Sequence, residues 1–221
     1  MSKPLAHSFS ALKTYENCPL KYYHTRVAKT VRDVGGAATI HGEVVHKGLE
    51  NFLLGKEELS DDLSHVEDTA SAVKDATKQG FSLHVEQKLT LTENLTPTSW
   101  FAGDAWMRSI LDVNLMKGDR AIVMDWKTGK RRPDFFQLSL FALQVFEHFP
   151  EINHASTAFI WLKEGEVDRG EFYRSDKDKL WEEVMTRVRR IERSVANDQW
   201  PAKPSGLCRF CPAQQICKFG S

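Results

Sequence analysis

The spacing of hydrophobic residues changes several times along the chain, and each spacing predicts a different element. Residues 40–54 carry apolar side chains three or four positions apart, such as Val45 and Leu49, which predicts an amphipathic helix. Residues 81–91 alternate between apolar and polar side chains, which predicts a strand. The apolar run at residues 121–124 predicts a buried strand that ends in charged residues.

The same criteria applied to the whole chain predict a single mixed α/β domain over residues 1–221. Helices come first, then three strands, a helix, a hairpin of two strands and a last helix. The predicted elements are helix 8–28, broken near Pro19; helix 40–54; an exposed helix within 55–80; strands 81–91, 100–116 and 121–127; helix 135–149; strands 154–162 and 166–173; and helix 176–197.

Composition gives little direct indication of a partner. The chain has 30 basic and 30 acidic residues and a formal net charge of zero, so a nucleic acid would have to be met by a local basic patch. No apolar run approaches the ~20 residues of a membrane span, and the first ten residues lack the apolar core of a signal peptide. We therefore expect a cytoplasmic protein with no membrane association.

Two carboxylates are predicted to face each other on neighbouring strands. A two-residue turn at Gly118-Asp119 would pair strands 100–116 and 121–127 so that Asp112 lies opposite Asp125. Directly opposed residues have β-carbons ~5 Å apart, so these carboxylates would repel each other unless one is protonated or a cation lies between them. Oxygen ligands at this separation suit Mg²⁺ or Mn²⁺. Alternatively, the charged residues are solvated ends of strands.

Basic residues follow the carboxylate pair. Lys127 shares a strand face with Asp125 and could hold a water molecule or stabilise charge on a phosphate oxygen. Lys130, Arg131 and Arg132 are the best local candidates for phosphate contacts, although they could equally form a solvated turn.

Three further side chains have both a functional and a structural interpretation. Glu86 could contact the metal or simply face solvent from its strand. Trp100 and Trp106 could stack on unpaired bases, but packing in the core is the more common role for a tryptophan in an apolar strand.

The cysteines predict a metal site. Three form the spacing C-x2-C-x5-C and a fourth lies near the start of the chain: Cys208, Cys211, Cys217 and Cys18. Thiolate-only ligation suits zinc or an iron–sulfur cluster, and a single C-x2-C pair favours [4Fe–4S] over zinc. Closing so long a loop would stabilise the fold by roughly 4–5 kcal/mol on the chain-entropy account of cross-links.

Several of these stretches resemble one known family. "RSILDVNL" followed by "VMDWKTGK" resembles the core of the PD-(D/E)XK nuclease superfamily, in its RecB-like branch, with an Asp on one strand and (Asp/Glu)-x-Lys on the next. "GEVVHKGLENFL" resembles a helix of that branch, and "QLSLFALQ" resembles its Gln-x-x-x-Tyr helix with Phe141 in place of Tyr. The resemblance implies a restriction-endonuclease-like mixed central sheet flanked by helices, with its core in residues 81–175.

The resemblance also implies roles for individual residues. Asp112, Asp125 and His46 would bind catalytic Mg²⁺ or Mn²⁺, and Lys127 would position the attacking water or stabilise the transition state. From its own position, one helical turn into helix 135–149, Gln137 could reach a phosphate or a base edge. Without the family, His46 is more simply a half-buried histidine on an amphipathic helix, and Phe141 a core residue.

The two ends of the chain resemble the iron–sulfur subgroup of this branch. "SALKTYENCPLKYY" together with "CRFCPAQQIC" has the subgroup's pattern of one cysteine before the core and three after it. This subgroup includes CRISPR-associated and AddAB-type nucleases. The resemblance implies that a [4Fe–4S] cluster joins residues 8–28 to residues 205–219, with zinc the less favoured ligand.

The predicted function is a metal-dependent DNA exonuclease that acts on ends or single strands in recombination, repair or phage DNA processing. DNA rather than RNA rests on the family resemblance. The alternatives are a non-catalytic nucleic-acid-binding module on a nuclease scaffold and a CRISPR-adaptation nuclease. The sequence has no G-x-x-x-x-G-K-[ST] motif, so any unwinding would need a helicase partner, and a recombinase is a further possible partner.

Overall fold

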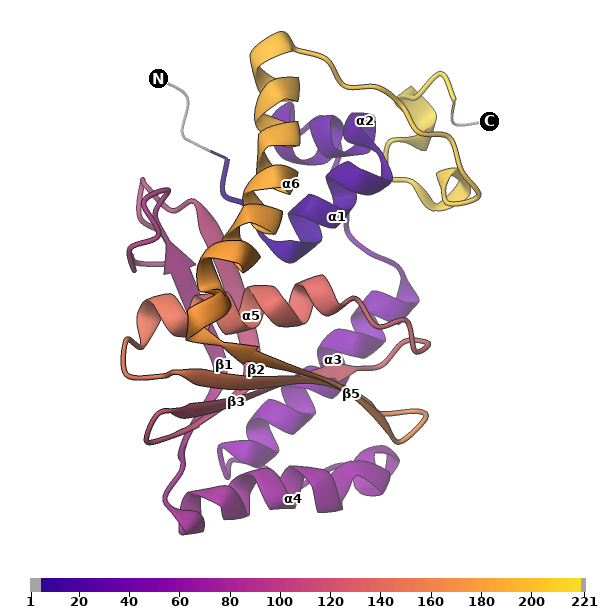
Figure 1. Cartoon of the computed structure of the whole chain (residues 1–221). Coiled ribbons are helices and arrows are strands. Elements are labelled where there is room, and N and C mark those ends of the chain that lie inside the picture. The colour runs from indigo at the N-terminus through magenta and orange to yellow at the C-terminus, as the bar shows by residue number, and fades with distance from the viewer. Residues whose placement is uncertain (1–4, 220–221) are drawn as a thin grey trace.

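A five-stranded mixed sheet forms the centre of the molecule. We describe residues 5–219 of a computed structural model. The strands lie in the order β1-β2-β3-β4-β5, with helices on both faces of the sheet (Figure 1). The expected mixed sheet flanked by helices, as in restriction-endonuclease-like folds, is confirmed.

The elements follow the predicted order. The strands are β1 Ser82–Leu91, β2 Met107–Lys117, β3 Arg120–Lys127, β4 His154–Trp161 and β5 Glu166–Tyr173. The α-helices are α1 Phe9–Asn17, α2 Pro19–Tyr22, α3 Ala37–Leu53, α4 Glu67–Ala76, α5 Phe135–His148 and α6 Lys177–Asn197. Short helical turns include the π-helical turn η1 Tyr23–Val27 and the 3₁₀ turns Asp61–Val66, Cys208–Phe210 and Gln214–Ile216. Proline at the first position of α2 explains the break in the first predicted helix.

Helix α5 is apolar on nearly every side because other elements cover it on two sides. Neighbouring strands are antiparallel except β3 and β4, which are parallel and joined by α5. Helix α5 therefore packs on the sheet with one side and beneath α1 and α6 with the other, and ten of its residues are buried. Helices α3 and α4 cover the opposite face (Figure 1).

The second strand begins later than predicted. The hydrophobicity pattern placed its start at Trp100, but β2 begins at Met107. The hydroxyl of Thr98 donates to Asp104 at 3.1 Å, which helps to hold the intervening residues in turns. Trp106 is 5% exposed and packs in the core, which agrees with the core-packing interpretation of the sequence. Trp100 is half-buried at the surface.

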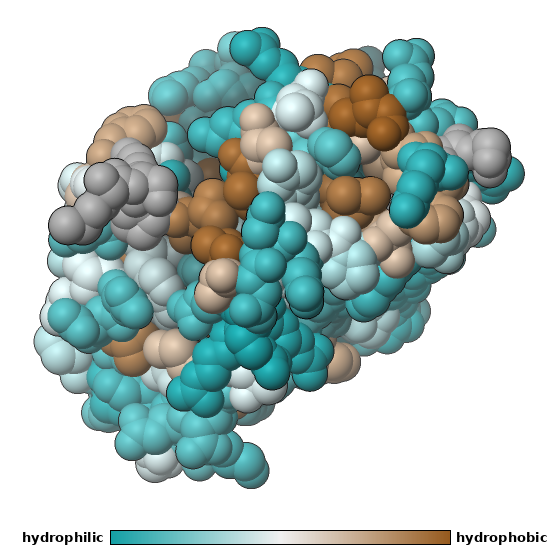
Figure 2. Space-filling model, turned by 90° about the horizontal axis from the view of Figure 1, so that it is seen from above, coloured by the Kyte–Doolittle hydropathy of each residue, from teal (hydrophilic) through white to brown (hydrophobic). Residues whose placement is uncertain are grey.

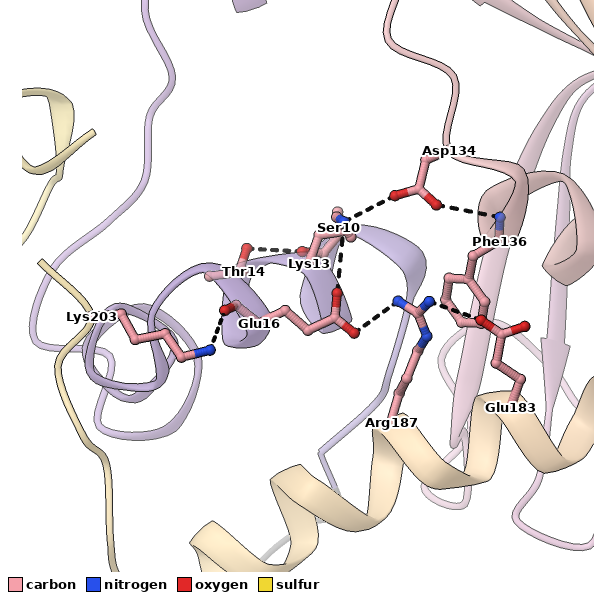
Figure 3. A network of polar contacts seen from close by, with 9 residues as sticks. All are labelled: Ser10, Lys13, Thr14, Glu16, Asp134, Phe136, Glu183, Arg187 and Lys203. Atoms are coloured by element: carbon pink, nitrogen blue, oxygen red, sulfur yellow. Dashed lines mark hydrogen bonds and ion pairs between the residues drawn. The ribbon is translucent and has the colours of Figure 1, made fainter. Parts of the chain in front are cut away.

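A network of ion pairs ties both ends of the chain to the start of α5 (Figure 3). Glu16 in α1 accepts from Arg187 of α6 at 2.8 Å, and its backbone oxygen accepts from Lys203 at 2.8 Å. Lys13 bridges to Asp134 at 2.9 Å, and Asp134 is the N-cap of α5. The start of α5 is therefore linked through α1 to two other parts of the chain. These are α6 and the C-terminal segment, residues 198–219.

The C-terminal segment is apolar at its surface. Leu207, Phe210 and Ile216 are each more than half exposed. Figure 2 looks down on this end of the molecule and shows brown hydrophobic residues among the teal ones. A segment that buries so little of its own apolar surface has to gain stability from a cross-link or from the rest of the fold. Within residues 5–219, no helix combines the length and the apolar composition that a membrane span requires.

His7 is a buried histidine that makes the stability of the protein depend on pH. It lies beside the start of β2, is 4% exposed, and packs its ring edge-on against Trp106. Burial lowers its pKa from 6.5 to about 4. The unfolded chain therefore binds more protons than the folded one between these values, and stability falls as the pH is lowered through this range.

We expect His7→Asn to reduce this pH dependence. Between pH 6.5 and pH 4, the wild-type free energy of unfolding should fall relative to that of the variant by at most about 3 kcal/mol. Urea unfolding at several pH values measures the difference, and exposed His41 offers the control His41→Asn. Parallel pH profiles for wild type and His7→Asn would contradict the assignment.

Candidate active site and metal centre

The candidate site lies where β2 and β3 separate. The two strands pair as far as Val113 and Met124, and the next residues along each strand are Asp112 and Asp125. The register is the one predicted from the short turn, in which Gly118 has a φ of 59°. The two carboxylates therefore flank the point at which the ladder ends.

Beyond the end of the β2–β3 ladder, the side chain of Asp112 takes the place of a backbone acceptor. Its Oδ2 accepts the backbone N–H of Trp126 at 2.8 Å. The same oxygen lies 3.3 Å from Nδ1 of His46, which α3 brings to the sheet. Asp112 is 7% exposed, so the carboxylate is held between two strands and a helix with little access to solvent.

Glu86 completes a group of three potential ligands. The β1–β2 ladder pairs Val85 with Val113 and resumes at Gln87, so Glu86 falls opposite Asp112 in register. Its φ of 50° lies in the left-handed region, which is costly for a non-glycine residue and is often associated with function. One ligand atom each from His46, Glu86 and Asp112 lies within 4.8 Å of the other two.

The charges in this group oppose one another. Burial raises the pKa of Asp125 to about 6, and the nearby charge of Asp112 adds to this effect. Burial, followed by the charge of Asp112, also raises the pKa of Glu86. Burial lowers the pKa of His46, but its hydrogen bond to Asp112 and the surrounding carboxylates more than offset this and leave the pKa raised. A divalent cation would relieve the repulsion, and an oxygen-rich set with one imidazole suits Mg²⁺ or Mn²⁺.

Asp125 forms an ion pair with Lys127 and accepts a hydrogen bond from Gln137. Lys127 Nζ lies 2.6 Å from Asp125 Oδ2. Gln137, in the first turn of α5, donates from Nε2 to Asp125 Oδ1 at 3.1 Å and accepts from Lys127 Nζ at 3.1 Å. The sequence suggested that Gln137 reaches DNA directly, whereas the structure joins it to the Asp-x-Lys pair. Phe141, one turn later, is 4% exposed and packs in the core.

The three basic residues after β3 do not form one free patch. Arg131 donates to both carboxylate oxygens of Asp168 in β5, at 2.9 and 2.6 Å. Lys130 and Arg132 are exposed. Phosphate contact by Lys130 and Arg132 stays a prediction, while the charge of Arg131 is engaged within the fold.

The four cysteines line one pocket of about 100 Å³ between α1, α2 and the C-terminal segment. The backbone N–H of Lys203 donates to Cys18 at 3.5 Å, and that of Ser205 donates to Cys208 at 3.3 Å. In the part of the chain that the structure describes, no three of their sulfur atoms lie within 4.8 Å of one another, and all four thiols are free. The expected cysteine cluster joining the two ends is thus not shown, and the iron–sulfur cluster stays a prediction.

Glu86 is the site residue whose role the sequence leaves undecided. Its pattern allows a metal contact or a solvent-facing position on the strand. The available signal was the register of β1 on β2, but the long connection between these strands leaves that register undetermined in the sequence. The positive φ of Glu86 has no sequence signature.

We expect Glu86→Gln to weaken binding of Mn²⁺ by at least about tenfold, because it removes a charged oxygen ligand. Titration calorimetry measures the affinity, and Glu93→Gln, in the exposed loop after β1, is the matched control. The metal-free variant should be at least as stable as wild type, because a half-buried repulsive charge is lost. An unchanged affinity for Mn²⁺ would exclude Glu86 from the site.

The fold is shared with a solved protein of low sequence identity. A protein from Eubacterium rectale that is provisionally named an exonuclease superposes with a TM-score of 0.56 at 13% identity, over 97% of this chain and 90% of that one. SSO0001 gives a TM-score of 0.49 at 14% identity, over 100% of this chain and 90% of that one. LHK-Exo in complex with dAMP gives 0.38 at 12% identity, over 89% and 91%. A search of curated proteins gave no match.

The sequence itself matches a family profile along nearly its whole length. The profile describes the PD-(D/E)XK nuclease superfamily and matches residues 6–218. The matched range contains both diverging strands, helix α5 and all four cysteines. The protein therefore belongs to the PD-(D/E)XK nuclease superfamily.

Proposed function

We propose that this chain is a single-domain, divalent-cation-dependent deoxyribonuclease that hydrolyses phosphodiester bonds at DNA ends or in single strands. The observation that carries the proposal is the group of Glu86, Asp112 and His46, in which Asp112 is buried, beside the ion pair of Asp125 and Lys127. Such a combination would put cation ligands at the same end of the sheet as an ammonium group that is paired with Asp125, where both can act on a phosphodiester.

Each residue has a separable role. His46, Glu86 and Asp112 would hold the cation, together with Asp125 on the neighbouring strand. A bound Mg²⁺ or Mn²⁺ lowers the pKa of a coordinated water and offsets charge on the phosphate. The ammonium of Lys127, held between Asp125 and Gln137, would orient the attacking water or stabilise negative charge on a phosphate oxygen.

The finer parts of the proposal rest on resemblance. The RecB-like branch, the DNA substrate and exonuclease action come from the motifs in the sequence, and the fold is shared with a protein provisionally named an exonuclease. A helicase or recombinase would supply duplex opening or the following step.

We expect metal-dependent degradation of end-labelled single- and double-stranded DNA. Asp125→Asn and Lys127→Met should each lower the rate by at least about a hundredfold, because each removes charge that acts on the reacting phosphate or water. Gln137→Ala should have a smaller effect, because it acts through these two side chains. The exposed Lys179→Met is the matched lysine control.

The outcome separates catalysis from scaffolding. Loss of product in Asp125→Asn with normal thermal unfolding would support the proposal. Intact DNA after incubation with wild type and Mg²⁺ or Mn²⁺, with DNA binding retained, would contradict it and favour a non-catalytic binding module.

We also propose that the cysteine pocket holds a [4Fe–4S] cluster. The convergence of all four cysteines on one pocket and the N–H groups directed at two sulfurs support this assignment. Four thiolates around one tetrahedral zinc, at about 2.3 Å from the metal, would lie about 3.8 Å apart. Among the described residues no three of these sulfurs lie within 4.8 Å of one another, which does not match this zinc geometry.

Anaerobically purified protein should absorb broadly near 400 nm and contain about four iron atoms per chain. Cys18→Ser should remove this absorbance and lower the unfolding temperature, because one ligand and one cross-link between the ends are lost. Thr14→Ala, which alters the same pocket without removing a sulfur, should keep both. Stoichiometric zinc without iron would contradict the proposal.

A further inference from the structure

A second cavity opens beside the candidate active site. It has a volume of about 390 Å³ and lies between the start of α1, the turn η1, the first residues of β2 and helix α5. We call it the Trp100 groove, after the aromatic residue in its wall. Gln137 lines this groove and also contacts Asp125 and Lys127, so the groove is continuous with the candidate site.

The groove runs along β2 toward the metal ligand Asp112. Side chains alternate along a strand, so Arg108 and Ile110 point to the same face of β2, and Asp112 follows two residues later. Lys88 of β1 pairs with Ile110 and joins this face. From Arg108 to Asp112 the strand rises about 13 Å, which corresponds to a few nucleotides of a nucleic-acid strand.

The side chains of the groove combine an aromatic surface with cations. The charged groups of Lys88 and Arg108 lie 5.7 and 5.4 Å from the centre of the Trp100 ring. Arg26, from η1, lines the same cavity. Ile110 is 38% exposed, although it lies on a strand within the sheet.

Two buried nitrogen atoms in this wall lack a partner. Arg108 Nε and His7 Nδ1 are each buried without a hydrogen bond to any residue that the structure describes. His7 is 4% exposed and lines the groove together with the N-cap of α1, Ser8. Polar atoms left unpaired in a fold are costly, and the Arg108 Nε–H can only donate, so a ligand that supplies an acceptor oxygen fits this wall.

We propose that the Trp100 groove binds an unpaired strand of the nucleic acid next to the cleavage site, with a base stacked on Trp100 and phosphates beside Arg26 and Arg108. Single strands are bound by this combination of cations and aromatic rings, because every base has a face that can stack. A paired base in a duplex does not present that face. The inference rests on the nuclease function proposed above and adds the strand type and its binding residues.

Binding can be tested without cleavage. A fluorescein-labelled ten-nucleotide oligothymidine is titrated with the full-length protein in EDTA, and fluorescence anisotropy gives the affinity. Trp100→Ala and Arg108→Gln should each weaken binding by about tenfold or more. Trp100→Phe keeps an aromatic face and should retain most of the affinity.

Two neighbouring positions supply matched controls. Phe101 is 83% exposed and follows Trp100 outside the groove, and Arg120 is exposed at the far end of β3. Phe101→Ala and Arg120→Gln should bind the oligonucleotide as wild type does. Wild-type affinity in both Trp100→Ala and Arg108→Gln would overturn the proposal, as would an equal loss of affinity for a blunt duplex of the same length.

The result also separates this proposal from the proposed function. Weakened binding in the two groove variants, in a protein that cleaves nothing, would support the groove and contradict the nuclease. Normal cleavage of single strands with unchanged binding in these variants would support the nuclease and overturn the groove.

Discussion

Negative charge concentrated at the point where β2 leaves β3 is the constraint on which the rest of the site depends. Asp112 lies between Glu86 on one side and Asp125 on the other, and burial with mutual repulsion raises the pKa of both neighbours. Such a group costs stability in the absence of a cation. The fold nevertheless holds it in place, with Asp112 bonded to the backbone of Trp126 and to His46.

Helix α5 links this site to distant parts of the chain. Its first turn supplies Gln137, which fixes the relative positions of Asp125 and Lys127. Its N-cap, Asp134, is bridged to α1, and α1 is in turn bonded to α6 and to the C-terminal segment (Figure 3). The cysteine pocket lies in these same terminal segments. A cross-link there would therefore restrict the elements that position Gln137, as well as stabilise the ends.

Local signals in the sequence predict most of the elements of the fold and the pairing of Asp112 with Asp125. The short turn at Gly118 determined the β2–β3 register, which brought Asp112 beside Asp125. The start of β2 was wrong because turns between Thr98 and Asp104 interrupt an apolar run that reads as a strand. The position of Glu86 depends on the register of β1 on β2 and on a positive φ, and neither leaves a pattern in the sequence. The hydrogen bonds of Gln137 depend on how α5 packs against β3, which the sequence does not show either.

The most direct test of this account is the position of a bound cation. Crystals soaked in Mn²⁺ and measured near the manganese absorption edge give an anomalous difference map that locates the ion without reference to activity. We predict a peak in contact with the side chains of His46, Glu86 and Asp112. Absence of a peak at this site in crystals that bind Mn²⁺ elsewhere would contradict the claim that the diverging strands form a metal centre.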